Sequence, residues 1–209
     1  MGCAAADVAD ALRAAAGVVA QHRDELVRLD REIGDGDHGE NLTRGFGALV
    51  SALDEQVPAT PGAVLKLVAT TLISKVGGAA GPLYGTAFLR AATSVGDAAE
   101  LDGQLVATAL QAALEGVVAR GKAAVGDKTM VDALTPAVAA AQSVASAGGD
   151  AAGVLTAAAE AAGQGAESTV PLVARKGRAS YLGERSAGHL DPGARSTALL
   201  LRALVGGAR

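Results

Sequence analysis

Residues 8–19, with the sequence VADALRAAAGVV, indicate most directly which class of fold this chain adopts. Val8, Leu12, Ala15 and Val19 follow the four-three-four spacing of one apolar helix face. Alanine, the best helix former, is the commonest residue of the whole chain. The stretch therefore predicts an amphipathic helix with close, small-residue packing.

The same periodicity recurs along the rest of the chain, between glycine-rich breaks and with almost no strand pattern. Leu26 and Leu29 indicate a second short helix after His22, and the spacing returns at Leu42, Phe46, Leu49 and Leu53. Further helices are expected over residues 64–76, 84–95, 101–119, 129–145, 153–173 and 195–205. We predict an all-α, up-and-down arrangement of about eight antiparallel amphipathic helices with short connections.

Composition excludes several classes of protein. A length of 209 residues suits one domain, residues 1–209, and 50% hydrophobic residues with 19% charged residues exclude a disordered chain. A net charge of -4 and 2% aromatic residues argue against nucleic-acid binding. The sequence shows no membrane span and no signal peptide, and Cys3 is the only cysteine. We expect a cytoplasmic protein that binds neither nucleic acid nor membrane.

Polar, charged and glycine residues concentrate in four segments, residues 30–41, 77–86, 120–132 and 175–196. Alternate loops of an up-and-down bundle lie at the same end, so several of these segments could converge on one site. The first segment carries the sharpest chemistry, because Asp35 and Asp37 alternate with glycine and Asp30 ends the preceding helix.

Three ionised carboxylates within a few ångströms repel one another by about 4 kcal/mol per pair at an effective dielectric constant near 20. Such a cluster needs a cation, and oxygen ligands without cysteine favour Mg²⁺ or Ca²⁺ over zinc. The calcium-hand spacing is missing, so Mg²⁺ shared with substrate phosphates is the better hypothesis. The alternative is an acidic turn whose aspartates cap the next helix.

The other three segments are less specific. Residues 77–82, with the sequence Gly-Gly-Ala-Ala-Gly-Pro, have few side chains, so a phosphate or a flat base could bind against their main chain. The alternative is a loop that only connects two closely packed helices. Asp127 or Thr129 could cap a helix. The basic residues of 175–195 could supply cations for phosphate oxygens or form a solvated face. For His38, a structural role and a role in the site are both open.

Together, the four segments resemble the ADP-binding L subunits of bacterial dihydroxyacetone kinases. The matching strings are IGDGDHG at 33–39, GGAAGPLYGT at 77–86, GDKTMVD at 126–132 and KGRASYLGERS at 176–186, followed by Gly188-His189 and Asp191-Pro192-Gly193. They occur in the order and spacing of that family and cover nearly the whole chain.

This resemblance implies a barrel of eight antiparallel amphipathic helices with the nucleotide at one end. By position, Asp30, Asp35 and Asp37 would hold two Mg²⁺ ions that bridge the phosphates of ADP or ATP. Arg178 would be the catalytic residue. The residues implied to contact the nucleotide are His38, Gly39, Glu40, Asn41, Ala79, Ala80, Gly121, Met130, Arg178, Asp191, Pro192 and Gly193.

The resemblance also implies partners. The family holds its ketose covalently on a histidine of a separate K subunit. A free-standing L subunit commonly keeps ADP bound, and a multiphosphoryl M subunit fed by the phosphoenolpyruvate phosphotransferase system rephosphorylates it. Exchange with free ATP is the alternative. We also expect a homodimer. One departure is Ala80, where the family usually carries Ser, so a hydroxyl contact is lost and nucleotide affinity should be altered rather than abolished.

Other functions stay open. Related fatty-acid kinase domains carry Pro-Asp-Gly-Asp-Thr-Gly in the first loop. This chain has Gly-Asp-Gly-Asp-His-Gly at residues 34–39, which disfavours that branch. Kinases for other three- or four-carbon ketoses share the motifs more closely. Some L subunits are coactivators of a transcription regulator. A structural helical protein that binds only a divalent metal would retain no nucleotide after purification.

Overall fold

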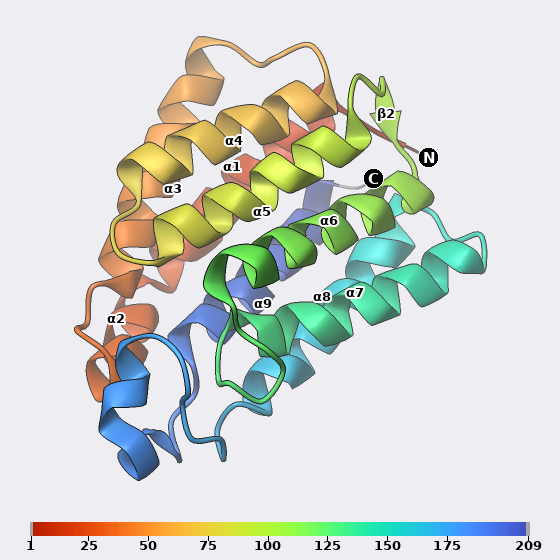
Figure 1. Cartoon of the computed structure of the whole chain (residues 1–209). Helices are drawn as coiled ribbons and strands as arrows, with labels where there is room; N and C mark the ends of the chain where they lie inside the picture. The colour runs from red at the N-terminus through yellow and green to blue at the C-terminus, as the bar shows by residue number, and fades with distance from the viewer. Residues whose placement is uncertain (1, 208–209) are drawn as a thin grey trace.

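The computed structural model describes residues 2–207, which form nine α-helices joined by short connections (Figure 1). The all-α class predicted from the sequence is confirmed. The helices are α1 (Ala5–Gln21), α2 (Arg23–Ile33), α3 (His38–Glu55), α4 (Pro61–Lys75), α5 (Ala80–Val95), α6 (Gly103–Gly121), α7 (Met130–Ser146), α8 (Ala151–Glu167) and α9 (Pro192–Leu204).

Eight of these helices pack in a closed sequence of neighbours. Along the chain, α3 packs on α4, α4 on α5, and so on to α9, and α1 contacts both α3 and α9. The short helix α2 lies outside this sequence, at one end of the molecule, beside α3 (Figure 1). The connections α2–α3, α4–α5 and α6–α7 therefore lie at the same end as the segment between α8 and α9.

Several helices begin at residues that the sequence makes good caps. The side chains of Thr60, Asp102 and Asp150 each accept a hydrogen bond from the first turn of α4, α6 and α8. Such caps satisfy backbone N–H groups that have no partner within the helix. Pro61 and Pro192 occupy first-turn positions, where a missing N–H costs nothing.

Two segments differ from the sequence prediction. The helix expected over 153–173 ends at Glu167, because Pro171 lacks an N–H and disfavours helical geometry at the residue before it. The expected loop 175–196 contains the 3₁₀ helix η1 (Arg178–Ser186), with a kink at Gly183. A second 3₁₀ turn, η2 (Val205–Gly207), follows α9, and strands β1 (Cys3–Ala4) and β2 (Glu100–Leu101) pair antiparallel at the far end (Figure 1).

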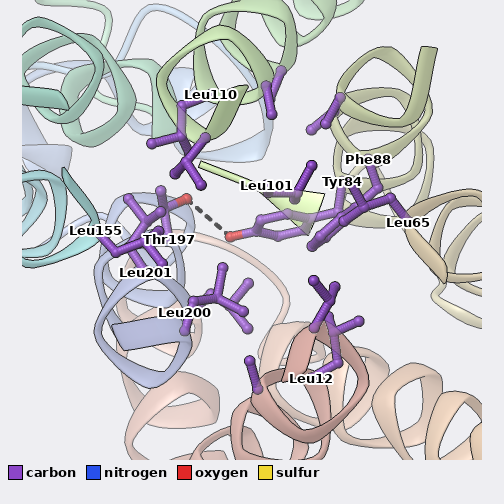
Figure 2. Close-up of a pocket in the computed structure, with 18 of the residues that line it drawn as sticks. Leu12, Leu65, Tyr84, Phe88, Leu101, Leu110, Leu155, Thr197, Leu200 and Leu201 are labelled. Atoms are coloured by element: carbon purple, nitrogen blue, oxygen red, sulfur yellow. Dashed lines mark hydrogen bonds between the residues drawn. The ribbon is translucent and has the colours of Figure 1, made fainter. Parts of the chain in front are cut away.

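The interior is filled by small and aliphatic side chains, and it leaves an apolar cavity of about 150 Å³ between the helices. Figure 2 shows leucines from α1, α4, α6, α8 and α9 around this cavity, with the Tyr84 hydroxyl bonded to Thr197 at its edge. Although the interior is apolar, none of the helices within residues 2–207 has both the length and the hydropathy to cross a membrane.

Candidate functional site

Three carboxylates converge where α2 ends and α3 begins. One oxygen from each of Asp30, Asp35 and Asp37 lies within 4.8 Å of the others. Asp30 comes from the last turn of α2, whereas Asp35 and Asp37 are exposed on the connection to α3. Hard oxygen donors at this spacing can together coordinate a divalent cation such as Mg²⁺.

The glycines of this connection are needed for its shape. A Cβ atom at Gly34 would collide with the carboxylate of Asp30, so any side chain there would push Asp30 out of the cluster. Gly36 has a φ of +76°, a left-handed conformation that side chains rarely adopt. The alternation of Gly and Asp therefore serves the geometry of the carboxylates.

Helix capping does not account for Asp37. Asp37 is the N-cap residue of α3, yet its side chain accepts no hydrogen bond from that helix, unlike Asp102 and Asp150 at their helices. Instead, the Asp30 Oδ2 atom accepts from the backbone N–H of Asp37 at 2.9 Å and of His38 at 3.1 Å. Asp30 thus satisfies N–H groups at the start of α3, whereas the Asp37 carboxylate caps no helix and is left available to a ligand.

The cluster borders a cavity of about 400 Å³ at this end of the helices, which we call the mouth. All four polar segments singled out in the sequence contribute to it. Of the predicted site residues, those that line the mouth are Asp30, Asp35, Asp37, His38, Asn41, Ala79, Ala80, Gly121, Met130, Arg178, Asp191, Pro192 and Gly193.

Two predicted site residues do not line the mouth. The side chain of Glu40 pairs with Arg23 on α2, and Gly39 is buried where a Cβ would strike the Arg23 carbonyl. Because the helical bonds of α3 begin with Asn41 N–H to the Asp37 carbonyl, the N–H groups of Gly39 and Glu40 precede the ladder. Only their backbone could serve an anion.

His38 connects the mouth to the helical interior. Its Nε2 atom lies 2.9 Å from the Ser196 hydroxyl, which lies 2.7 Å from the Tyr84 hydroxyl. Burial lowers the pKa of His38, although Asp30 and Asp37 favour its charged form. The ring therefore stays neutral near pH 7 and is held in place by α9 and α5.

The α4–α5 connection supplies main chain beside the side-chain amide of Asn41 on α3. Gly78 has a φ of +64°, and a Cβ on Gly77 would come within 2.8 Å of the Asn41 Oδ1 atom. That oxygen accepts a hydrogen bond of 2.6 Å from Arg44, so the amide nitrogen of Asn41 is left to donate. Ala80 begins α5, and its methyl group cannot supply the hydroxyl of the serine that the resembling family usually carries at this position.

Gly121 ends α6 beside Leu83 of α5, and the other predicted residues lie on the side of the mouth formed by α7, η1 and α9. Thr129 caps α7 and forms a capping box with Asp132, as expected, whereas the carboxylate of Asp127 accepts from the backbone of Ala124. Arg178 reaches across to Asp35, with 3.1 Å between Nη2 and Oδ2. Burial raises the pKa of Asp191 to about 7, although the Ala194 N–H that it caps favours the charged form.

Two lysines also line the mouth. Lys176 belongs to the basic segment that the sequence offered as a source of cations for phosphate oxygens, whereas sequence reasoning missed Lys128. Lys128 is 1% exposed, although lysine is almost never fully buried without a partner. The only sequence signal for Lys128 was its place in the string GDKTMVD, which reveals nothing about its burial.

This set of segments is found in known proteins. Residues 32–206 match the family model for the DAK2 domain. The chain belongs to the DAK2 domain family. It is 46% identical to "PEP-dependent dihydroxyacetone kinase 1, ADP-binding subunit DhaL" of Listeria innocua, over 90% of this chain and 88% of the relative. It is 44% identical to the corresponding subunit of Escherichia coli, over 86% of each chain. The predicted resemblance to L subunits is confirmed.

A solved structure extends this similarity to part of a longer chain. The dihydroxyacetone kinase of C. freundii, solved in complex with AMP-PNP and Mg²⁺, matches with a TM-score of 0.73 and 27% identity. The match covers 99% of this chain and 34% of the C. freundii chain. The fold described here is therefore also found as about one third of a kinase that binds a nucleotide.

Proposed function

We propose that this chain is the nucleotide-binding, phosphoryl-transfer subunit of a dihydroxyacetone kinase. The observation that carries the proposal is the convergence of Asp30, Asp35 and Asp37, with Arg178 beside them, at the mouth. The relatives that are named ADP-binding subunits support it, because they are 44–46% identical over most of their length.

The donor set fits Mg²⁺, since carboxylate oxygens within 4.8 Å of one another are hard ligands, and the Asp37 side chain caps no helix. In this proposal Asp30, Asp35 and Asp37 hold two ions. Bound Mg²⁺ would neutralise charge on the phosphate oxygens and polarise the bond to the transferred phosphoryl group.

The residues of this chain orient the nucleotide and stabilise charge. Asn41 donates its amide N–H groups, and the first turns of α3 and α5 present backbone N–H groups to the phosphates. Arg178 has a side chain that is 69% exposed, so it can leave Asp35 for the oxygens of the transferred group. Phosphoryl transfer depends mainly on such positioning and charge neutralisation.

The acceptor is proposed to come from a partner. In this proposal dihydroxyacetone is bound to a separate K subunit that covers the mouth. The reaction takes place in the cytoplasm, and this chain forms a homodimer. Relatives named PEP-dependent support a cycle in which ADP stays bound and an M subunit rephosphorylates it. Direct exchange with ATP is the alternative donor.

Native mass spectrometry of the purified protein tests the nucleotide assignment. We expect ADP and magnesium to be retained, and their loss together on treatment with a chelator. A coupled assay with a K subunit and dihydroxyacetone then separates the donors, because only the PEP-dependent cycle needs the M subunit and phosphoenolpyruvate. A chain that binds no nucleotide at millimolar MgADP would refute the proposal.

A second candidate is a subunit acting on another small ketose. The chain is 38% identical to the L-erythrulose 1-kinase of Mycolicibacterium smegmatis, over 90% of this chain and 33% of that kinase. Because the proposed ketose site lies on the partner, the same assay with L-erythrulose in place of dihydroxyacetone distinguishes the two substrates.

A further inference from the structure

Lys128 is a buried cation with an unusual backbone. It is 1% exposed, precedes the N-cap residue of α7, and has a φ of +62°, in the left-handed region that non-glycine residues rarely adopt. A strained backbone at a buried charged residue requires compensation from its surroundings. The cause of this arrangement is found at the end of its side chain.

The ammonium group of Lys128 is held by three backbone carbonyls. Nζ donates to the Thr169 carbonyl at 2.6 Å, to the Val170 carbonyl at 3.4 Å, and to the His189 carbonyl by a shorter bond. Its three N–H groups are thereby matched by three acceptors. Burial lowers the pKa of Lys128, while the charges of Asp191 and Asp132 favour its protonated form.

These carbonyls belong to segments that form one side of the mouth. Lys128 directly precedes Thr129, Met130 and Val131, which line the mouth, and His189 precedes Asp191 by two residues. Further bonds join the same segments: Asp191 N–H to Thr169 Oγ1 at 3.0 Å, and Gly188 N–H to the Val170 carbonyl at 2.7 Å. The loop after α6 and the segment after α8 meet at this end of the molecule (Figure 1).

We propose that Lys128 is a positioning residue for the nucleotide, whose buried ammonium locks the α6–α7 loop, the end of α8 and the start of α9 into one wall of the mouth. It acts through those backbones and does not touch the ligand, because its N–H groups are all directed at carbonyls. This inference rests on the proposed function, since it assumes that the nucleotide occupies the mouth.

The test compares Lys128→Met with Asp150→Ala in the full chain, with MgADP as the probe. Asp150 caps α8 at the opposite end, so its loss should lower thermal stability without reaching the mouth. We expect Lys128→Met to raise the Kd for MgADP at least tenfold and Asp150→Ala to change it less than twofold. Faster amide exchange in 168–177 and 187–191 should accompany the first variant only.

Chemical rescue separates the ammonium from general packing and covers the case in which Lys128→Met does not fold. Lys128→Ala should regain MgADP affinity with added propylammonium, and n-propanol should have no such effect. Equal rescue by both compounds, or a Kd within twofold of wild type in Lys128→Met, would overturn the inference. If the wild-type chain itself fails to bind MgADP, the proposed function fails instead.

Discussion

The apolar cavity and the mouth lie next to each other and are built by different parts of the chain. Tyr84 and Met130 border both of them. The apolar cavity is lined mainly by side chains of helices, whereas the mouth is lined by the connections between helices together with the helix ends beside them. Helix interiors thus supply packing and stability, and the connections supply charge and backbone groups for a ligand. Substitutions in the two cavities should therefore affect different properties.

The largest effect is expected at the carboxylates of the mouth. Asp35→Ala or Asp37→Ala should abolish binding of MgADP, because the remaining carboxylates would not hold the proposed Mg²⁺ ions. Helicity should be unchanged, since neither side chain caps a helix. Equilibrium dialysis and far-UV circular dichroism measure the two properties. Asp10→Ala, on the exposed face of α1, is the control. Retained ADP affinity in either mouth variant would contradict the metal role.

A substitution in the apolar cavity should have the opposite signature. Leu200 is 5% exposed, and Leu200→Ala should lower the free energy of unfolding by about 2–5 kcal/mol. The Kd for MgADP should change little while the chain remains folded. Urea unfolding measures the loss, and Leu89→Ala, at a residue 40% exposed, is the matched control. A large loss of ADP affinity in Leu200→Ala would show that the cavities are not independent.

Arg178→Ala should slow phosphoryl transfer about 100-fold, because this guanidinium is the proposed partner of the transferred group. Its ion pair with Asp35 is largely exposed, so the free energy of unfolding should change by less than about 1 kcal/mol. Turnover with a K subunit and urea unfolding measure the two effects. Arg185→Ala in the same 3₁₀ segment provides the control. Unchanged turnover would remove Arg178 from the site.

The smallest effect is expected at the wall that the cavities share. Tyr84→Phe removes a hydroxyl that forms hydrogen bonds with Ser196 at 2.7 Å and with Thr197 at 3.0 Å, the second of which is drawn in Figure 2. The hydroxyls of Ser196 and Thr197 would still donate to the Gly193 carbonyl. The free energy of unfolding should therefore fall by only about 1 kcal/mol. ADP affinity should fall less than threefold. A tenfold loss would mean that the chain from Tyr84 through Ser196 to His38 sets the geometry of the mouth.

The sequence predicted the helices and placed the three carboxylates together because both depend on neighbouring residues. Apolar periodicity gives the helix faces, and the alternation of Gly and Asp between 34 and 37 places the aspartates on one short connection. The sequence prediction put the end of α8 at residue 173, whereas the helix ends at Glu167. Apolar periodicity alone does not mark this end, which Pro171 favours by disfavouring helical geometry at the residue before it.

Only the tertiary structure revealed contacts between residues far apart in the chain. His38 and Ser196 are separated by 158 residues, and Lys128 and His189 by 61. The sequence determined by itself that the chain is helical and that a few connections carry its charged groups, because local spacing controls both. Which connections share one mouth, and that a lysine is buried within its wall, follow from how the helices pack, which no local pattern records.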